Sequence, residues 1–513
     1  MGRLRVAIRA DASVATGTGH VRRCVALAHA LSDCGAEVRF VLHPADGTAA
    51  PLMAGLPFAC EWLDASSSPT DQNAAIAAIA AFDPQVVVVD QYGITAPWHE
   101  AVRARFSCLV AAVDDLADRP LAPDVLIDHN FHPDPVAKYR DVIPEGVRLL
   151  AGPRFALLGS AYAQGARYRF SEDVRSIGIF MGGTDLVDAC SAALRGCREV
   201  ADFAGPIEIV SSCMSPHIDA LKALCARTPG ATLAVDLPDL AAFFARHDLH
   251  IGAGGGGTWE RCCVGAPTIA CLVADNQMAT LPHLEAIGVL AWANPGGSLA
   301  SADLREGIGS CVAALVRDPG RRRELASRGA QLVDGKGAAR IAAVLACAAE
   351  RTLRMRPAGA EDEDLLLDWA NDPVVRANAF QPQLIPPQQH AVWFRAKLTQ
   401  SAQCRIFVGQ AGNGIPAGQV RFDWRADQRG DHWEISYSVD TAFRGLGLAR
   451  PLLCGALDSL RRDAIPARVV GRVKPDNKSS ARVLRALGFS EAAAFDERGH
   501  FTLFTLEFAE ARQ

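Results

Sequence analysis

The first residues with the types and spacing for chemistry surround a glycine-rich turn near the N-terminus. Gly17 and Gly19 flank one threonine, and His20 follows at once, after an apolar segment that carries Arg9 and Asp11. Glycine lets backbone N–H groups approach an anion at the start of a helix, where partial positive charge lies. A histidine there can exchange a proton near neutral pH. The pattern predicts a ligand site with a titratable group; the alternative is an ordinary strand-to-helix connection with a structural histidine.

A second glycine-rich loop stands in the last quarter of the chain, after an apolar segment at residues 433–439 and before a predicted helix at about residues 448–460. Its residues with a possible role are Arg444, Gly445, Gly447, Leu448 and Ala449. Such a loop presents successive backbone N–H groups to a pyrophosphate, and its small residues permit close approach. The pattern predicts an anion site, and the alternative is a simple glycine turn.

The elements that must position the first loop form a strand–helix–strand unit. Residues 4–10 and 37–42 are predicted strands, and residues 20–34 form a helix with apolar residues at helical spacing. Short apolar strands at residues 86–89, 109–113 and 125–127 are followed by Asp90, Asp114 and Asp128. Open α/β sheets place ligands at the carboxyl ends of their strands. These aspartates therefore mark the expected ligand edge of a first lobe.

A second α/β series follows the first and is closed by helices. Its strands are predicted at residues 174–181, 207–210, 249–251 and 268–273, and its last helices at residues 301–317, 321–333 and 339–350. A segment of different texture then begins at Thr352. It has a helix at residues 361–369 and strands at residues 404–409, 418–424 and 433–439. The predicted fold class is α/β, with two Rossmann-like lobes (1–155 and 156–350) and a third α/β domain (351–513).

The composition of the 513-residue chain fits an enzyme that acts on small molecules. Half of the residues are hydrophobic, 21% are charged and the net charge is −5, which argues against nucleic-acid and membrane partners. No signal peptide or membrane span can be drawn, and the 15 cysteines show no CxxC spacing. We therefore expect reduced thiols, no metal site and a cytoplasmic location.

Several ordered motifs within residues 4–335 resemble one enzyme family, the UDP-2,4-diacetamido-2,4,6-trideoxy-altropyranose hydrolases of pseudaminic acid biosynthesis. The motifs are RADAS at 9–13, GTGHVRRC at 17–24, VDQYG at 89–93, WHE at 98–100, DD at 114–115, GPRFALL at 152–158, GAGGGGTWERCC at 252–263 and ADNQ at 274–277. The family has a GT-B-like fold of two lobes, related to the GlcNAc transferase of peptidoglycan synthesis. This agrees with the two α/β series predicted above.

The resemblance implies substrate contacts in both lobes. In the first lobe and around the diphosphate, the implied contacts are Arg9, Gly17, Gly19, Tyr92, Gly183, Thr184, Gly256, Gly257 and Thr258. It assigns Glu260 to the ribose hydroxyls, and Asn276 and Gln277 to the sugar. A glycine-rich backbone with one hydroxyl suits phosphates, and a carboxylate suits a diol. The alternatives are a surface helix residue at Glu260 and a capped turn at 276–277. The family often has Ser or Thr where this chain has Gly256 or Gly257.

The resemblance also implies a hydrolytic mechanism. UDP leaves readily once its charge is stabilised, so the enzyme needs one base to direct water and no pair of catalytic carboxylates. The family gives that role to His20, with inversion at the anomeric carbon. Asp11 is a second catalytic candidate, as the group that orients the imidazole or the sugar.

The C-terminal segment, residues 352–508, resembles the GNAT acetyltransferases. The R-x-x-G-x-A core at 444–449 matches their acetyl-CoA pyrophosphate loop, and NKSS at 477–480 with LGF at 487–489 matches their later signature. N-acetylation needs a neutral amine and a protonated leaving thiolate. Glu434 is the candidate base, or else an exposed strand carboxylate, and Asn477 is a candidate contact to the cofactor. Many relatives carry a tyrosine as the acid where this chain has Leu484.

The two resemblances together predict a bifunctional enzyme that acts on UDP-sugars with acetyl-CoA as co-substrate. In the pathway, acetylation of a 4-amino UDP-sugar yields the diacetamido substrate that the hydrolase cleaves. Two alternatives stay open from the residues alone. One is a glycosyltransferase that passes the sugar to an acceptor, and the other is a nucleotide-sugar-binding module joined to an acetyltransferase of another amine.

Overall fold

The computed structural model describes residues 3–13, 17–44, 46–68, 70–400, 402–426, 430–463, 468–496 and 499–507. The chain divides into two compact units, Met1–Ala342 and Ala343–Gln513, and the division falls inside helix α14 (Gly337–Glu350). Across these described ranges, no helix is long and apolar enough to cross a membrane.

The first unit opens with a seven-stranded parallel sheet in the order β3-β2-β1-β4-β5-β6-β7. Its strands are β1 (Arg5–Ala10), β2 (Glu37–Leu42), β3 (Ala59–Trp62), β4 (Val86–Asp90), β5 (Leu109–Val113), β6 (Val125–Asp128) and β7 (Arg148–Ala151). The order reverses between β1 and β4, and such a switch point opens a crevice at the carboxyl ends of the strands. The crevice is therefore expected where the first glycine turn and Asp90 lie.

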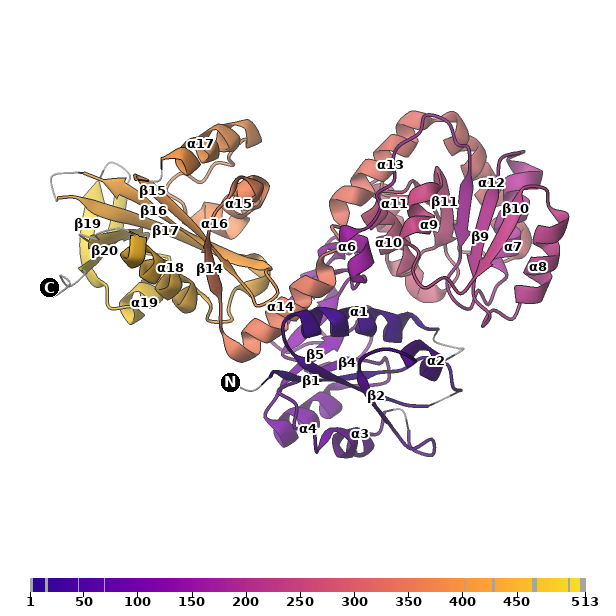
Figure 1. Ribbon diagram of the computed structural model, residues 1–513, viewed down its shortest axis with the longest axis horizontal. Coiled ribbons are helices and arrows are strands. Elements are labelled where there is room, and N and C mark those ends of the chain that lie inside the picture. Colours follow the sequence, from indigo (N-terminus) through magenta and orange to yellow (C-terminus); the bar gives the residue numbers. More distant parts are fainter. Residues whose placement is uncertain are drawn as a thin grey trace. The chain divides into compact units, whose positions relative to one another are not determined.

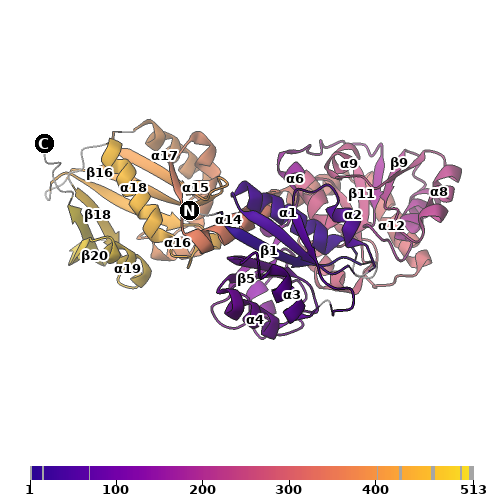
Figure 2. The ribbon, with the colours of Figure 1, turned by 60° about the horizontal axis from the view of Figure 1, so that its bottom comes forward.

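Helices cover both faces of this first sheet. Figures 1 and 2 show α1 (Gly19–Asp33) on one side and α3 (Gln72–Ile79) and α4 (Ala96–Phe106) on the other. The central strand β4 consists of four valines and an aspartate, all buried, as expected of a parallel strand covered on both faces. Shorter helical segments are α2 (Ala49–Met53), α5 (Pro135–Tyr139), η1 (Pro153–Phe155) and α6 (Ser160–Gln164).

The second sheet of this unit is also parallel, with six strands in the order β10-β9-β8-β11-β12-β13. Its strands are β8 (Ile177–Phe180), β9 (Ile207–Ser211), β10 (Ala231–Val235), β11 (Leu249–Ala253), β12 (Thr268–Cys271) and β13 (Ala291–Trp292). One face packs against α7 (Ala189–Arg195), η2 (Gly196–Val200), α8 (Ile218–Arg227) and α12 (Ser301–Arg317). The other packs against α9 (Ala241–Arg246), α10 (Gly257–Val264) and α11 (Leu281–Ala286). The switch point lies between β8 and β11, and α13 (Pro319–Leu332) packs on α10.

The second unit contains a seven-stranded mixed sheet in the order β14-β15-β16-β17-β18-β20-β19. Its strands are β14 (Arg354–Pro357), β15 (Cys404–Gln410), β16 (Pro416–Arg425), β17 (His432–Val439), β18 (Arg468–Val473), β19 (Ser490–Asp496) and β20 (Gly499–Glu507). Figure 1 shows α15 (Glu363–Asn371) and α17 (Pro387–Thr399) on one face and α18 (Ala449–Asp463) and α19 (Lys478–Ala486) on the other. The short elements η4 (Ala360–Asp362), α16 (Pro373–Asn378) and η5 (Thr441–Phe443) connect them.

The predicted fold class, two Rossmann-like lobes followed by a third α/β domain, is confirmed. The strands expected at residues 37–42 and 109–113 and the helix expected at 301–317 have those bounds. The helix expected at 321–333 begins earlier, at Pro319, because the Asp318 side chain accepts a hydrogen bond from the Arg321 N–H. The edge strands β3, β7 and β10 were not predicted, because they are half-exposed and their apolar runs are at most three residues long.

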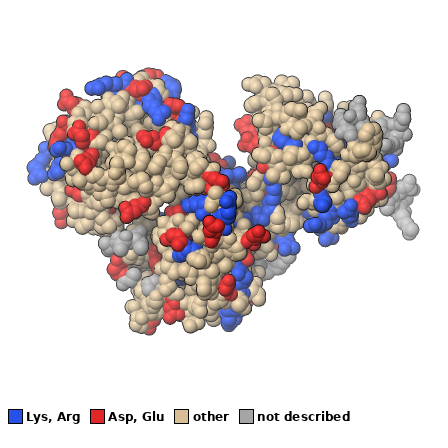
Figure 3. Space-filling model, turned by 180° about the vertical axis from the view of Figure 1, so that it is seen from behind, with Lys and Arg blue, Asp and Glu red and all other residues tan. Residues whose placement is uncertain are grey.

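Charged side chains are mixed over the surface. On the face shown in Figure 3, Lys and Arg side chains lie among Asp and Glu side chains on both units. This distribution agrees with the small net charge of the chain, −5.

Candidate active sites

His20 lies at the switch point of the first sheet. β1 and β4 are neighbours, and Ala10 is paired with Asp90 at their carboxyl ends. His20 is the second residue of α1 and is 8% exposed. Its Nδ1 lies 2.6 Å from Oδ1 of Asp90. The fold thus joins a histidine to a carboxylate 70 residues further along the chain.

Arg23, one helical turn after His20, binds both oxygens of Asp90. Its Nε and Nη2 donate to Oδ2 and Oδ1 at 2.6 Å each, and Nη2 lies 3.1 Å from His20 Nδ1. Burial alone would raise the pKa of Asp90, but the charge of Arg23, aided by His20 and by hydrogen bonds, holds that pKa well below its usual value. Asp90 therefore stays a carboxylate and accepts the Nδ1 proton of His20. We assign Nε2 as the basic atom of the ring on this ground.

The predicted role of Asp11 in orienting the imidazole is wrong, because Asp90 holds that nitrogen. Asp11 accepts hydrogen bonds from Arg9 Nη1 and Nη2 at 2.5 and 2.7 Å and from the His43 N–H at 2.8 Å. The Arg9 side chain is 2% exposed and bound to Asp11, and its predicted contact with substrate stays a prediction. This ion pair fixes the chain after β1, and a role of Asp11 toward the sugar stays a prediction.

Gly17 and Gly19 shape the turn that leads into α1. Gly17 has φ +76°, a conformation that other residues adopt only with strain, and its N–H donates to the Ser13 carbonyl at 2.8 Å. Gly19 is the exposed first residue of α1. The predicted contacts of both glycines with substrate stay predictions.

A chain of hydrogen bonds connects the His20 region with the second sheet. The Tyr92 ring meets the His20 ring edge-on at 4.6 Å between centroids. The Tyr92 hydroxyl donates to Asp115 Oδ1 at 2.7 Å, and Asn130 Nδ2 donates to Asp115 Oδ2 at 3.0 Å. Asn130 Oδ1 in turn accepts from Trp259 Nε1 of α10 at 3.0 Å. Tyr92, a predicted substrate contact, thus adjoins the candidate base, and the links beyond it were missed by sequence reasoning.

The other aspartates at strand ends are held by structural partners. Asp114 Oδ2 pairs with Arg119 at 2.7 Å. Asp128 Oδ2 accepts from Lys138 Nζ at 2.7 Å and from the Tyr139 hydroxyl at 3.0 Å. Each buried carboxylate is therefore matched by a cation, as burial of charge requires.

The glycine segments of the second lobe lie at its own switch point. Gly183 and Thr184 follow β8, and Gly256 and Gly257 follow its neighbour β11. A Cβ on Gly183 would lie 3.3 Å from Thr18 Oγ1, so the loops after β8 and β1 approach each other closely. The fold thus brings the motifs predicted from both lobes toward one region.

Thr258 does not present its hydroxyl to a ligand. Its side chain is 0% exposed, and Oγ1 donates to the Ala253 carbonyl at 3.3 Å and accepts from Arg261 Nη2 at 3.1 Å. The Thr258 hydroxyl is therefore held by protein groups, and the predicted contact of Thr258 with the diphosphate stays a prediction. Gly256, which precedes α10, and Gly257, its first residue, stay the predicted phosphate contacts of this loop.

The residues predicted to meet the ribose and the sugar differ in how they are held. Glu260 is partly buried near Tyr162, and burial raises the pKa of its carboxyl group. Gln277 Oε1 accepts from the Val273 N–H at 2.9 Å, which agrees with the alternative of a capped turn. Asn276 is exposed in the short helix η3 (Asp275–Ala279).

In the second unit, the predicted pyrophosphate loop has a backbone that requires glycine. Gly445 and Gly447 both have φ +76°. Leu448 is 2% exposed, so a cofactor contact there involves its backbone, and Ala449 begins α18. The loop therefore presents main chain to a ligand.

Arg444 anchors this loop through its guanidinium. Nε donates to the Val439 carbonyl at 3.0 Å, and Nη2 pairs with Asp372 at 2.7 Å. Asp372 also caps α16, accepting hydrogen bonds from two of its N–H groups. The contacts of Arg444 thus position the loop, and a direct contact with the cofactor stays a prediction.

The strands beside this loop separate from each other. β17 and β18 are paired over three residues, Trp433 to Ile435 on β17, and not beyond. Past that point each strand presents unpaired main-chain groups to an extended ligand with amide groups. This opening leads from the centre of the sheet toward the glycine loop.

The side chains predicted for acetyl transfer have protein partners. Glu434 pairs with Arg425 Nε at 2.9 Å and Arg472 Nε at 3.1 Å. Asn477 caps α19, with Oδ1 accepting from the Ser480 N–H at 3.1 Å. Leu484 is 2% exposed and part of the core. The Tyr437 hydroxyl, not predicted from the sequence, donates to Ser480 Oγ at 3.0 Å.

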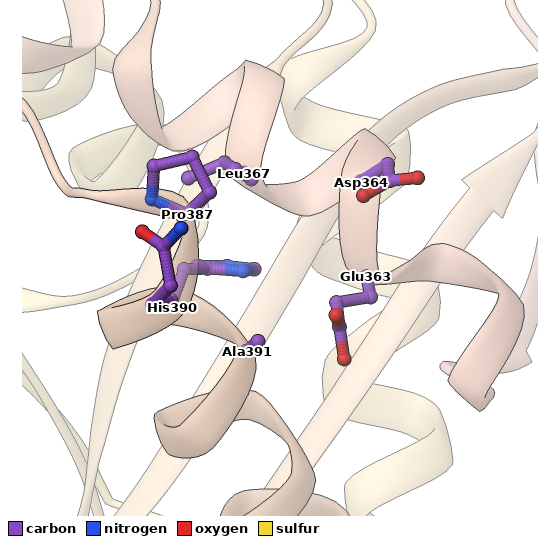
Figure 4. Close-up of a pocket in the computed structure, with 7 residues that line it drawn as sticks. Glu363, Asp364, Leu367, Pro387, His390 and Ala391 are labelled. Carbon is purple, nitrogen blue, oxygen red and sulfur yellow. The ribbon is translucent and has the colours of Figure 1, made fainter.

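A separate cavity of about 210 Å³ lies between α15 and α17 (Figure 4). Glu363, Asp364 and His390 are among its lining residues, and it contains none of the residues predicted from the sequence. Over the part of the chain that the structure describes, no group of three or more His, Cys, Asp or Glu side chains is arranged to hold a metal ion.

Comparison with known proteins finds similarity to two different kinds of protein. Residues 352–490 match the acetyltransferase (GNAT) domain family. A stretch of 218 residues, 40% of this chain, is 28% identical to the spore coat polysaccharide biosynthesis protein SpsG of Bacillus subtilis (strain 168), and the match spans 60% of that protein.

Solved structures are similar to one part of the chain or the other. MurG of Acinetobacter baumannii is 17% identical, with a TM-score of 0.47, over 67% of this chain and 99% of MurG. The putative acetyltransferase yncA of Salmonella typhimurium, solved with acetyl-CoA, is 24% identical, with a TM-score of 0.28, over 32% of this chain and 97% of yncA. The chain thus joins a region similar to a polysaccharide-biosynthesis protein to an acetyltransferase domain of the GNAT family.

Proposed function

We propose that the first unit hydrolyses UDP-2,4-diacetamido-2,4,6-trideoxy-β-L-altropyranose to UDP and the free sugar, in the cytoplasm. The second unit would make that substrate by acetylating the 4-amino UDP-sugar with acetyl-CoA, in pseudaminic acid biosynthesis. The observation that supports the hydrolase most strongly is the pair of His20 and Asp90 at the switch point, with 2.6 Å between Nδ1 and Oδ1. It supplies the single base that this reaction needs.

In the proposed hydrolysis, His20 Nε2 takes a proton from water as the water oxygen attacks the anomeric carbon. The bond from that carbon to the phosphate oxygen breaks with inversion, and UDP leaves with the electron pair. Asp90 keeps the Nδ1 proton in place and stabilises the imidazolium that forms. Tyr92, whose ring lies edge-on to His20, would contact the sugar.

The second lobe would hold the nucleotide. Backbone N–H groups at Gly256 and Gly257, at the start of α10, suit the diphosphate, as do Gly183 and Thr184 after β8. Glu260 would bind the ribose and Asn276 the sugar. These assignments come from the resemblance, and the positions of their loops at the switch point between β8 and β11 support them.

In the proposed acetyl transfer, the 4-amino nitrogen forms a bond to the thioester carbonyl carbon and the carbon–sulfur bond breaks, releasing CoA as a thiolate that takes a proton from solvent. The glycine loop before α18 would bind the pyrophosphate through its main chain, and the opening between β17 and β18 would take the extended arm of CoA. Glu434 would accept the amine proton through water.

The proposal is tested by incubating the full chain with the 4-amino UDP-sugar and acetyl-CoA and following the products by mass spectrometry. We expect the diacetamido UDP-sugar first, then UDP and the free sugar. Release of UDP only when an acceptor is added would make the first unit a glycosyltransferase. Acetylation without any release of UDP would reduce it to a binding module.

A further inference from the structure

Arg261, in the second turn of α10, is a buried cation with few partners. Its side chain is 1% exposed. Nη2 donates to the Ala253 carbonyl at 2.8 Å and to Thr258 Oγ1 at 3.1 Å. Neither Nη1 nor Nε has a hydrogen-bond partner in the described part of the protein, and no carboxylate there lies within 4.0 Å of its nitrogens. The positive charge is thus buried without a close ion-pair partner, and the neighbouring Glu260 carboxylate acts on it only from beyond that distance.

Two other arginines are equally buried and are held differently. Arg9, 2% exposed, makes two hydrogen bonds to the Asp11 carboxylate. Arg322, 0% exposed, donates to four backbone carbonyls, those of Leu315, Val316, Ser171 and Glu172. Burying an arginine is costly unless its charge is paired or fully hydrogen-bonded. Arg322 has both Nη nitrogens engaged and only Nε without a partner, whereas Arg261 has neither a carboxylate partner nor an acceptor for Nη1 or Nε.

The guanidinium lies directly against the glycine loop. A Cβ on Gly252 would stand 2.2 Å from Nη1, and one on Gly257 would stand 3.4 Å from it. The absent side chain at Gly252 therefore makes the space that Arg261 fills. The N–H groups of Thr258 and Trp259 bond to the carbonyls of Gly255 and Gly256. Within the described residues, the N–H groups of Gly256 and Gly257 have no acceptor.

We propose that Arg261 supplies the positive charge of a diphosphate site in which the main-chain N–H groups of Gly256 and Gly257 supply the hydrogen bonds. The close ion-pair partner that the described residues do not supply is the diphosphate of the nucleotide. The guanidinium of Arg261 attracts the diphosphate across the glycine loop, in an interior where charges are poorly screened. The inference rests on the proposed function for the identity of the nucleotide, and it adds a residue that discriminates a nucleoside diphosphate from a nucleoside.

The test compares the affinities of the full chain for UDP and for uridine by calorimetry. In Arg261→Met we expect UDP affinity to fall by about 10- to 10²-fold while uridine affinity changes little. The melting temperature without ligand should stay equal or rise, because an unpaired buried charge is replaced by an apolar side chain of similar length. Arg261→Gln, which keeps donors for Ala253 and Thr258, should lose the same preference for UDP.

Arg322→Met is the matched control, since it removes an equally buried guanidinium whose two Nη nitrogens are both bound to backbone carbonyls. It should melt lower and keep the ratio of UDP to uridine affinity. An Arg261→Met or Arg261→Gln variant that keeps this ratio overturns the inference, and so does a pair of variants that both fail to fold. A wild-type protein that does not bind UDP instead overturns the proposed function, so the two failures are distinguishable.

Discussion

The two candidate sites are built from different parts of the chain. In the first unit, the proposed chemistry depends on buried side chains from separate elements, with His20 of α1 8% and Asp90 of β4 1% exposed. In the second unit, the proposed cofactor loop is exposed main chain whose shape depends on Gly445 and Gly447 at φ +76°. A site made of side chains fails when one side chain is replaced. A site made of main chain fails when the backbone is distorted or when a new side chain keeps the ligand away from it. The two activities should therefore respond to different kinds of substitution.

The largest effect is expected from Gly447→Glu. The substitution strains a positive φ and places a carboxylate where a pyrophosphate should lie, so acetyl transfer should fall by more than about 10³-fold. Hydrolysis of the preformed diacetamido UDP-sugar by the same protein should be unchanged. The measurement is the rate of both reactions, with acetyl-CoA affinity from calorimetry.

Gly414→Glu is the control for backbone strain. Gly414 also has a positive φ, +82°, and lies in an exposed turn between β15 and β16. This variant should keep acetyl transfer. Equal losses in the two variants would show that strain alone is responsible, and would remove the loop from the cofactor site.

His20→Asn should act on the other unit. Asparagine cannot take a proton in this pH range, so hydrolysis should slow by about 10²- to 10⁴-fold while UDP binding and acetyl transfer change little. In ¹⁸O-labelled water, the wild type should place the label in the free sugar. Label in UDP would mean attack at phosphorus, and near-normal turnover of the variant would make His20 structural.

The sequence was more informative about the glycine loops than about which side chains the site residues bind. Each glycine turn could be predicted from local sequence, because glycines that precede a helix are visible there. Both turns also follow a strand in the fold. The partner of His20 was not visible in this way. Asp90 was noted as a strand end, but its contact with His20 depends on β1 and β4 being neighbours across the reversal of strand order.

Burial was the other property that the sequence did not show. Arg9 and Thr258 have side chains suited to a substrate, and the structure turns both inward, to Asp11 and to the Ala253 carbonyl. Which polar groups face a ligand depends on the direction of each side chain at the end of its strand or helix. That direction follows from packing between elements, which periodicity along one element does not report.

Asp90→Asn should have an intermediate effect. Removing the charge weakens the support of the imidazolium and leaves Arg23 with only the more distant Asp115 carboxylate, at 3.9 Å, so hydrolysis should fall by roughly 10- to 10²-fold, less than with loss of the base. The folded pKa of Asp90 is depressed, so its contribution to stability is present above its unfolded pKa and is lost as pH falls through the folded value. Denaturation curves against pH should show this acid loss in the wild type and not in the variant.

Asp128→Asn is the matched control for that experiment. Asp128 is equally buried at a strand end, but it binds Lys138 and Tyr139. The substitution should lower stability and leave the dependence of kcat/KM on pH unchanged. An Asp90→Asn variant whose pH profile also stays unchanged would mean that Asp90 supports the fold alone.

The substitution with the smallest expected effect tests whether the two lobes of the first unit act together. Trp259→Phe keeps an aromatic ring in α10 and removes the N–H that donates to Asn130 Oδ1 at 3.0 Å. One uncharged hydrogen bond contributes about 0.5–1.5 kcal/mol, so kcat for hydrolysis should fall by roughly 2- to 10-fold. Asn130→Ala should add little to that loss, because both changes break the same link to Asp115 and Tyr92.

Trp292→Phe is the control, because it removes a buried indole N–H that has no partner in the described residues, and it should leave kcat unchanged. Full additivity of the Trp259 and Asn130 variants would show that the link does not couple the nucleotide lobe to His20.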